Sequence, residues 1–227
     1  MDASVKTAGE VLSETSQAVL RSGAISMSGH GNISVRVAGR DEILFTAGGS
    51  LRQPTFVRLS LDGRLLEGEL PPVAAAVVSM HTAIYQDRPD TGCVIHTHSP
   101  YATAFAVANR SIEGWSEAFG IFGLEDGVPV AAYGPRGSEK AIANIRAVMT
   151  PRTSAVLLAN HGVLAWAAEA ERAVMLGVII EEAAQSAILA GSIGGAKIVP
   201  ADLLHSSKER HSQFEHAGVI KRHETSG

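Results

Sequence analysis

The chain has 227 residues, of which 45% are hydrophobic and 19% charged, and its formal net charge is −4. This composition is that of a folded globular protein, and the mildly acidic balance excludes the polybasic surface that nucleic-acid binding requires. A single cysteine, Cys93, excludes an internal disulfide framework and favours a reducing compartment, so we expect a cytoplasmic protein.

No linker-like segment divides the chain, so we expect one domain over residues 1–227, with residues 201–227 as a polar C-terminal tail. The N-terminal residues lack the apolar segment of a signal peptide. The longest apolar stretch, at residues 173–184, is interrupted by charge and is shorter than a bilayer-spanning helix. We therefore expect no membrane partner.

Hydrophobic periodicity and turn residues divide the chain into short elements. In chain order, the sequence predicts a helix at 8–22, strands at 33–37 and 42–46, a hairpin at 59–66, a helix at 73–88, a strand at 91–98, a helix at 100–107, a strand at 128–132, a helix at 138–149, strands at 155–159 and 162–166, a helix at 168–190 and one more helix in the tail. Several strands are joined by short connections. The pattern therefore predicts an α/β fold with a mixed or mainly antiparallel sheet flanked by helices.

Three of the nine histidines are candidate metal ligands. His96 and His98 lie two residues apart on a predicted strand, so both imidazoles project from one face. His161 follows another apolar strand, where a turn residue can reach the end of a neighbouring strand. Three neutral imidazoles with an open fourth position are typical of a catalytic divalent-metal site. Taken singly, an H-x-H pair does not specify a metal, and His161 could also simply complete a turn. The remaining tail histidines are interpreted as solvated: His205, His211, His216 and His223.

Four segments of the sequence resemble the class II aldolase/adducin family. They are GHGNISVR at 29–36, HTAIYQDRPDTGCVIHTHSPYATA at 81–104, YGPRGSE at 133–139 and LLANHGVLAW at 157–166. The resemblance covers residues 8–190 and implies a single three-layer α/β/α domain around a mainly antiparallel sheet. It also implies that the family's three metal histidines fall on His96, His98 and His161. The implied assembly is a homotetramer with active sites at subunit boundaries, where His211 or His216 could reach a neighbouring subunit's site.

The sequence departs from the sugar-phosphate enzymes of this family at Val77. The family pattern implies an acid/base carboxylate at this position, yet the chain has no acidic residue between Glu69 and Asp87. The same stretch should hold paired serines that bind a phosphate, and only Ser79 carries a hydroxyl. These losses argue against retro-aldol cleavage of a phosphorylated sugar.

The rest of the implied anion pocket is kept. Backbone N–H groups of its glycine-rich loops can bind a negative group, and an arginine can pair with a carboxylate. The candidate substrate-binding residues are Asn32, Gly48, Gly49, Ser50 and Arg52. His30 and His81 are the candidate catalytic histidines, since a proton must reach the reacting carbon. An ordinary surface-loop histidine is an equally good interpretation of His30.

These features favour a decarboxylase. One branch of the family decarboxylates hydroxylated aromatic acids, and the sequence is most similar to this branch. The resemblance implies metal-dependent decarboxylation of a hydroxylated pyridine dicarboxylate, as in vitamin B6 degradation. An oxyanion and the adjacent carboxylate can chelate a metal that acts as a Lewis acid. We expect Mn2+ as the cofactor, and Zn2+ would suit three imidazoles equally well.

Two other functions stay open at this point. An aldolase or epimerase on a hydroxy-carbonyl substrate would need a carboxylate from elsewhere, such as Glu117 or a neighbouring subunit. A non-enzymatic interaction domain, as in adducin, would be expected to have lost the metal histidines. This chain keeps all three of them.

Overall fold

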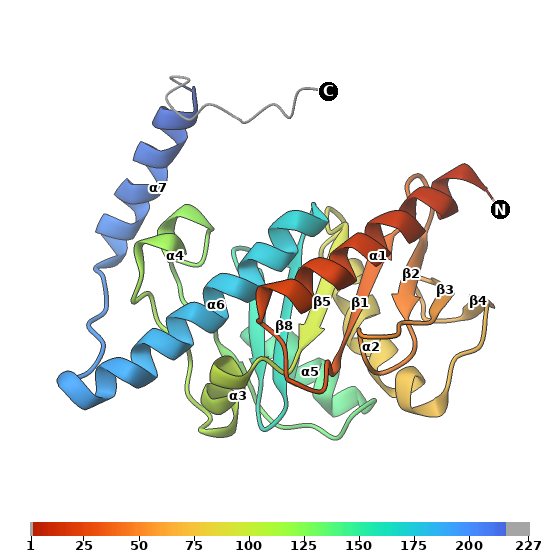
Figure 1. Ribbon diagram of the computed structural model, residues 1–227, viewed down its shortest axis with the longest axis horizontal. Coiled ribbons are helices and arrows are strands. Elements are labelled where there is room, and N and C mark those ends of the chain that lie inside the picture. Colours follow the sequence, from red (N-terminus) through yellow and green to blue (C-terminus); the bar gives the residue numbers. More distant parts are fainter. Residues whose placement is uncertain (1, 217–227) are drawn as a thin grey trace.

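The computed structural model describes residues 2–216 and contains one sheet of eight strands (Figure 1). The strands are β1 (Gly31–Arg36), β2 (Glu42–Thr46), β3 (Phe56–Ser60), β4 (Leu65–Glu67), β5 (Cys93–Thr97), β6 (Val130–Ala131), β7 (Ala155–Leu158) and β8 (Gly162–Ala167). Their order across the sheet is β4-β3-β2-β1-β5-β8-β7-β6. Every neighbouring pair is antiparallel except β6 and β7. The mainly antiparallel sheet expected from the sequence is confirmed.

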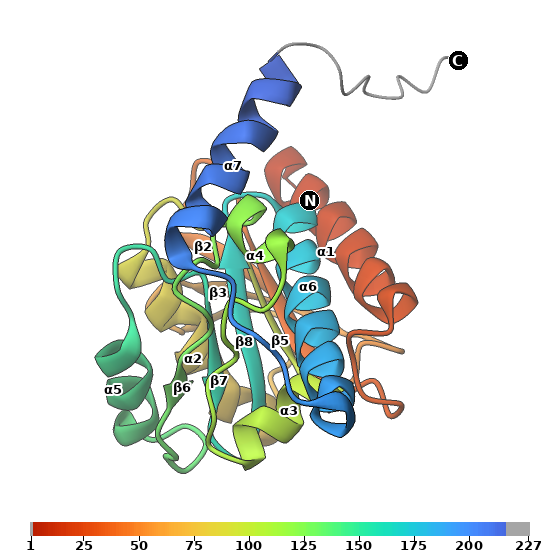
Figure 2. The same cartoon turned by 90° about the vertical axis from the view of Figure 1, so that its left-hand side faces the viewer.

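Helices cover both faces of this sheet. They are α1 (Ala3–Ser22), α2 (Pro72–Asp87), α3 (Pro100–Val107), α4 (Glu117–Ile121), α5 (Glu139–Val148), α6 (Ala170–Ala190), the 3-10 turn η1 (Gly191–Ile193) and α7 (Ala201–His216). Figure 2 shows α1 and α6 on one side of the strands and α2 and α5 on the other. The arrangement has the three layers that the sequence resemblance implies.

The first helix begins earlier than its apolar periodicity predicts. Asp2 caps it, because the Asp2 carboxylate accepts a hydrogen bond of 2.9 Å from the Ser4 N–H. Gly23 ends the helix as predicted, with a φ of 77° that favours glycine. One face of α1, including Leu12 and Val19, packs against Ile33 and other residues of the sheet.

The central strand β5 carries the first two candidate ligands. It lies between β1 and β8, and all five of its residues are buried. Alternate residues face opposite layers, so Cys93 and Ile95 pack toward α1 while Val94 packs beneath α2. His96 follows Val94 on the α2 face.

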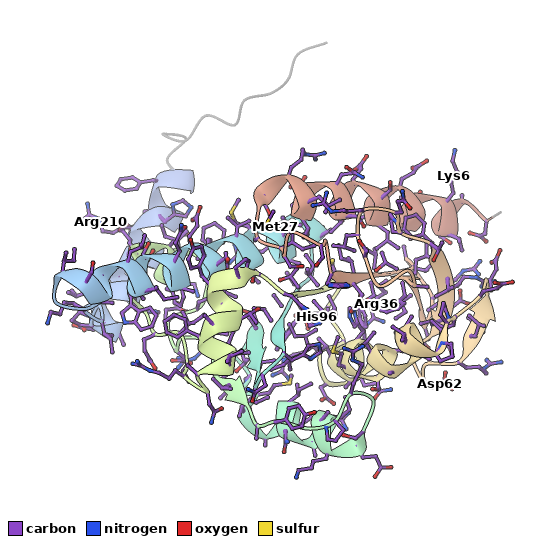
Figure 3. All side chains as sticks on the ribbon, turned by 60° about the horizontal axis from the view of Figure 1, so that its bottom comes forward. Lys6, Met27, Arg36, Asp62, His96 and Arg210 are labelled. Atoms are coloured by element: carbon purple, nitrogen blue, oxygen red, sulfur yellow. The ribbon has the colours of Figure 1, made fainter. Side chains whose placement is uncertain are left out.

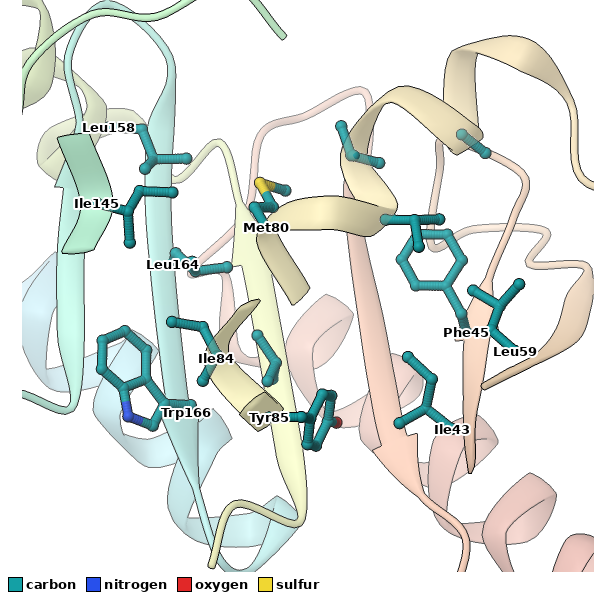
Figure 4. Close-up of a cluster of buried hydrophobic side chains, with 14 of the residues drawn as sticks. Ile43, Phe45, Leu59, Met80, Ile84, Tyr85, Ile145, Leu158, Leu164 and Trp166 are labelled. Carbon is teal, nitrogen blue, oxygen red and sulfur yellow. The ribbon is translucent and has the colours of Figure 1, made fainter. Parts of the chain in front are cut away.

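The core on the α2 face is a continuous cluster of apolar side chains (Figure 4). Phe45 from β2, Ile84 from α2 and Trp166 from β8 belong to it. These side chains fix α2 over the sheet on the same face as His96. The candidate site therefore stands on a rigid support.

Helix α6 lies within the helix predicted at 168–190. With η1 it extends over Ala170–Ile193, and by length and composition alone this helix could cross a membrane. One side of α6 is nevertheless part of the core, where Leu176 and Ile180 pack with Val163 of β8. A core helix passes the same length and composition test.

The predicted tail helix is present as α7, which projects away from the sheet (Figures 1 and 2). Its contact with the domain runs through Leu204, which is 1% exposed and packs in the cluster that contains Phe119 of α4. The short helix α4 was not predicted. It is stabilised by Ser116, whose hydroxyl accepts from the Ala118 N–H.

Candidate metal centre

His96, His98 and His161 come together at one end of β5. His96 lies on the strand, His98 just past its end, and His161 in the turn between β7 and β8. Their candidate ligand atoms all lie within 4.8 Å of one another. The Nε2 atoms of His96 and His98 are 3.1 Å apart. Two imidazole nitrogens bound to one zinc ion at ~2.0–2.1 Å are separated by roughly the same distance.

His96 is oriented to present Nε2 as a ligand. Its Nδ1–H donates to the Val163 carbonyl at 2.8 Å, so the unprotonated Nε2 faces the other two imidazoles. The side chain is 1% exposed, and burial lowers its pKa well below 6.5. Figure 3 shows His96 in the interior of the molecule. A neutral ring with a backbone acceptor on its other nitrogen is what a divalent cation requires.

The other two imidazoles are also held neutral. Burial, together with the charges of His98 and Arg136, lowers the pKa of His161 to about 4. The pKa of His98 is lowered chiefly by burial, with His30 and Arg136 acting in the same direction. All three donor groups fit a divalent metal at neutral pH, because a protonated imidazole cannot bind one.

The turn that carries His161 is fixed by its neighbours in sequence. Asn160 adopts a φ of 59°, which asparagine tolerates better than most residues, and its N–H donates to the Ala106 carbonyl at 3.1 Å. Gly162 follows, and a Cβ atom there would lie 2.5 Å from the Thr97 carbonyl oxygen. Glycine therefore allows the turn to approach β5 closely.

A cavity of about 320 Å3 opens beside the three histidines. It is lined by His30, Gly31, Asn32, Thr46, Gly48, Gly49, Ser50, Val73, Ala74, Val77, His96, His98, Arg136 and His161. The loop after β2 contributes three successive residues, with Gly49 at a φ of 70°. Backbone N–H groups in such a loop can bind an anion. The structure thus brings the three metal candidates together with four of the five substrate-binding candidates.

The fifth candidate, Arg52, does not line this cavity. Its Nη2 donates to the Met27 carbonyl at 2.7 Å, which supports the loop that leads to His30. His30 does line the cavity, and its ring centroid is 6.1 Å from that of His98. The Ser28 hydroxyl lies 2.9 Å from His30 Nδ1, so the His30 ring is oriented by its own loop.

His81 is buried behind the cavity wall and does not line it. Its Nε2–H donates to Asn32 Oδ1 at 2.6 Å, and its Nδ1 lies 2.8 Å from the Ser34 hydroxyl. Burial lowers the pKa of His81 to about 3, so the ring is neutral. Because Asn32 Oδ1 is occupied by this bond, the Nδ2 group of Asn32 is the one that can donate to a ligand. In this arrangement His81 acts on the cavity through Asn32.

Arg136 is a residue of the cavity that the sequence analysis did not select. It lies in the loop before α5 and lines the metal cavity together with His98 and His161. Within residues 2–216 it forms no ion pair. Its segment, Gly-Pro-Arg-Gly at 134–137, leads into a helix capped by Ser138, but no local pattern in it indicates where the Arg136 side chain lies.

Among the residues that the structure describes, no acidic side chain lines the metal cavity. Val77 occupies part of its wall, in agreement with the departure seen in the sequence. Glu117, the carboxylate considered as a replacement, lies on α4, where it accepts a hydrogen bond from Ser207 of α7. It does not line the cavity of its own protomer. Of the tail histidines, His205 pairs with Glu209, the side chain of His216 is outside the described part, and His223 lies beyond the described residues.

Comparisons with known proteins all point to one protein family. The pattern of the Class II Aldolase and Adducin N-terminal domain matches residues 10–188. A 5-methylthioribulose-1-phosphate/5-deoxyribulose-1-phosphate aldolase of Rhodospirillum rubrum is 30% identical over 188 residues, which cover 81% of this chain and 82% of that protein. The L-fuculose phosphate aldolase of Escherichia coli is 31% identical over 159 residues, which cover 68% of this chain and 71% of the relative.

The fold comparison agrees with the sequence comparison. A solved structure of L-fuculose 1-phosphate aldolase matches with a TM-score of 0.79 and 26% identity, over 93% of this chain and 98% of that one. The domain match extends from within α1 to within α6 and so contains the sheet and all three metal-ligand candidates. On these grounds the chain belongs to the class II aldolase/adducin family.

Proposed function

We propose that this protein is a divalent-metal-dependent carbon–carbon lyase that cleaves a small anionic hydroxy-carbonyl compound in the manner of an aldolase. One observation carries the proposal: three neutral imidazoles converge beside a cavity that holds an anion-binding loop and an arginine. The similarity to aldolases of phosphorylated sugars supports the reaction type. Epimerases that are 29% identical over 179 residues make an epimerase the closest variant of this function.

The chemistry needs a cation held by His96, His98 and His161. When bound there, a divalent metal supplies Lewis acidity that stabilises the enolate formed as the bond breaks. Three imidazoles suit Zn2+, which is our first choice of metal. Mn2+, expected from the sequence, is the second, because it is favoured by oxygen ligands and no protein carboxylate lines the cavity.

The chain's own residues bind and orient the substrate. The N–H groups of the Gly48–Ser50 loop and the amide of Asn32 would hold the anionic group. His81 keeps Asn32 in position from behind. Arg136 also lines the cavity and would pair with negative charge on the substrate.

His30 is the residue we assign to proton transfer. If the Ser28 hydroxyl donates to His30 Nδ1, the proton of the ring is on Nε2, where it can be given to the substrate. The ring lines the same cavity as His98, with the two ring centroids 6.1 Å apart. His30 would then take the acid/base role of the carboxylate that the family pattern implies at position 77, where this chain has a valine.

The lack of a carboxylate favours a second candidate function, decarboxylation of a hydroxylated pyridine dicarboxylate as in vitamin B6 degradation. Loss of CO2 leaves an enolate without prior removal of a proton by a base. Decarboxylation therefore does not require an acidic side chain in the cavity, where Val77 forms part of the wall. One carboxylate would leave while the second binds at Asn32 and the Gly48–Ser50 loop. Arg136 provides an additional cation for such a doubly charged aromatic substrate.

A substrate panel separates the two functions. Purified full-length protein loaded with Zn2+ or Mn2+ would be given L-fuculose 1-phosphate, 5-deoxyribulose 1-phosphate and a 3-hydroxypyridine-4,5-dicarboxylate, with aldehyde and CO2 measured separately. We expect aldehyde release from a sugar phosphate. CO2 release from the pyridine without aldehyde release would establish the decarboxylase instead, and neither product from a metal-loaded protein would refute both. A His98→Ala variant is the matched negative control.

We further propose a cytoplasmic homotetramer with active sites at subunit boundaries. The exposure of the metal cavity at its Arg136 side leaves room for a neighbouring subunit to complete the wall. Light scattering coupled to size-exclusion chromatography tests the assembly. A monomer that is fully active would contradict this part of the proposal.

A further inference from the structure

A second cavity lies next to the metal centre, between α2 and α5. Its volume is about 220 Å3. His161 and Arg136 line both this cavity and the metal cavity, so the two spaces meet at those side chains. A molecule held beside His161 can therefore extend in two directions.

The walls of the second cavity are mainly apolar. Met80 from α2 lies opposite Ile145 from α5 and Leu158 from β7, as Figure 4 shows. All three belong to the core cluster on this face of the sheet. Small side chains line part of the remaining wall, Ala76 and Ala141 among them, and leave space between these three residues.

Polar groups lie at the rim of this cavity. They include the side chains of Ser79, Tyr133 and Asn160, and Tyr133 is 60% exposed. Within residues 2–216, no acidic residue lines this cavity either. An apolar interior with a few polar groups at its opening is typical of a small-molecule subsite.

We propose that the cavity between α2 and α5 is a substrate subsite for a compact apolar group, such as a branched alkyl group, an alkylthio group or one aromatic ring. This inference rests on the proposed function, because the apolar group must be joined to an anionic head that binds in the metal cavity. A cavity of about 150 Å3 lined by aliphatic side chains binds benzene. The volume of about 220 Å3 is sufficient for a group of that size.

Metal-chelating hydroxamates with and without an apolar group test the subsite without requiring turnover. Isothermal titration of the zinc-loaded full-length protein would compare acetohydroxamate with 2-phenylacetohydroxamate. Each methylene equivalent removed from water strengthens binding about fourfold, so the phenyl compound is expected to bind at least about tenfold more tightly. Equal affinities for the two compounds would overturn the subsite.

Two variants of α2 test whether the tighter binding of the phenyl compound depends on this cavity. Ala76 is half-buried in the cavity wall, whereas Ala75 is exposed and does not line it. Ala76→Leu is expected to abolish the advantage of the phenyl compound while the affinity for acetohydroxamate stays within about twofold. Ala75→Leu, the matched control, is expected to retain the full advantage. Retention of the advantage in Ala76→Leu would overturn the proposal.

A third variant acts in the opposite direction. Ile142 of α5 is half-buried in the same wall, so Ile142→Ala enlarges the cavity and should improve the binding of 2-naphthylacetohydroxamate relative to the phenyl compound. If Ile142→Ala does not improve the binding of the naphthyl compound, the subsite is contradicted, even in the case that Ala76→Leu does not fold. Failure of acetohydroxamate itself to bind the zinc-loaded protein would instead contradict the proposed function, so the two failures are distinguishable.

Discussion

Gly162 determines how closely the turn with His161 approaches β5. A Cβ atom at this position would lie 2.5 Å from the Thr97 carbonyl oxygen and 3.0 Å from a ring carbon of His98. Gly162→Ala must therefore displace two parts of the metal site. We expect it to weaken Zn2+ binding about 10- to 100-fold, as loss of supporting contacts does at other metal sites.

The measurement is chelator competition, with circular dichroism to confirm folding. Gly177→Ala on α6 is the control, since a Cβ atom there meets nothing within 4 Å. Unchanged zinc affinity in Gly162→Ala would show that the close approach is not needed for the site.

Arg136 is expected to contribute to substrate binding through its charge. It lines both cavities and has no ion-pair partner within the described residues, so an anionic substrate can pair with it. Arg136→Gln should raise KM about tenfold or more with a smaller change in kcat, because a hydrogen bond to a charged group contributes about 1.5–3 kcal/mol. Steady-state kinetics on the identified substrate tests this. Arg110→Gln, at an exposed position outside both cavities, should leave KM unchanged.

The convergence of the three candidate metal ligands was predictable from the sequence, and the position of Arg136 was not. His96 and His98 follow from the two-residue period of a strand, and His161 from its place after a second strand. Arg136 stands in a loop, where no periodicity indicates the direction of a side chain. Its position depends on how α5 packs over the sheet, which a local sequence pattern does not specify.

The start of helix α3 depends on a carboxylate from another helix. Glu181 of α6 is 8% exposed and accepts hydrogen bonds from the N–H groups of Tyr101 and Ala102 at 2.9 and 2.8 Å. Ser99, at the N-cap position, makes no side-chain capping bond. Glu181 therefore supplies the cap for α3, directly after the strand end that carries His98.

Removal of this cap should destabilise the protein. Glu181→Ala leaves two buried N–H groups without acceptors, and we expect a loss of about 2–4 kcal/mol in the free energy of unfolding. Glu181→Gln keeps one acceptor oxygen and should lose less. Urea unfolding measures both, and the neighbouring Glu182→Gln, at an exposed position, is the control. Equal stability of all three variants would exclude the capping role.

Within the described residues of α7, Leu204 is the buried side chain that attaches the helix to the domain, beside the Ser207–Glu117 hydrogen bond and the Lys208–Glu125 ion pair. Leu204 is 1% exposed and Leu203 is 55% exposed, although the two are adjacent. Leu204→Ala is expected to release α7, because a buried leucine contributes about 2–5 kcal/mol. Limited proteolysis should then cleave between α6 and α7, and Leu203→Ala should resist cleavage like the unmodified protein.

Most elements were predictable because their own residues specify them. The strand at 42–46 and the helix at 100–107 have the predicted bounds. The helix α4 was missed, because its five residues are too few to show a helical period. The helix predicted at 168–190 agrees with α6 to within two residues at its start, and its charged residues, Glu181 included, are accommodated by the fold.

At the scale of the whole molecule, the antiparallel character of the sheet was predictable but the strand order was not. Short connections between strands indicate hairpins, as at Asp62-Gly63 between β3 and β4. The pairing of β1 with β5 joins residues about sixty positions apart, for example Asn32 with His96. This pairing places the anion loop beside the metal ligands, and it results from packing of the complete core rather than from either strand alone.

The buried imidazoles give the metal-free protein a predictable dependence of stability on pH. Burial lowers the pKa of His81 to about 3 and that of His96 well below 6.5. Between these values and the unfolded value of 6.5, the unfolded chain binds more protons than the folded one. Stability is therefore fully present above about pH 6.5 and is lost as the pH falls, by about 1.4 kcal/mol per pH unit for each such histidine.

Urea unfolding of the metal-free protein at pH 7.5, 6.0 and 5.0 measures this loss. His81→Gln should reduce the slope by the contribution of one histidine, whereas His205→Gln, on the exposed face of α7, should leave it unchanged. Saturating Zn2+ at pH 6.0 should restore stability, because the metal binds only the neutral imidazoles of the folded protein. A free energy of unfolding that does not change between pH 7.5 and 5.0 would mean that these rings are not held neutral in the folded state. The three-histidine site would then lack the donor form that metal binding requires.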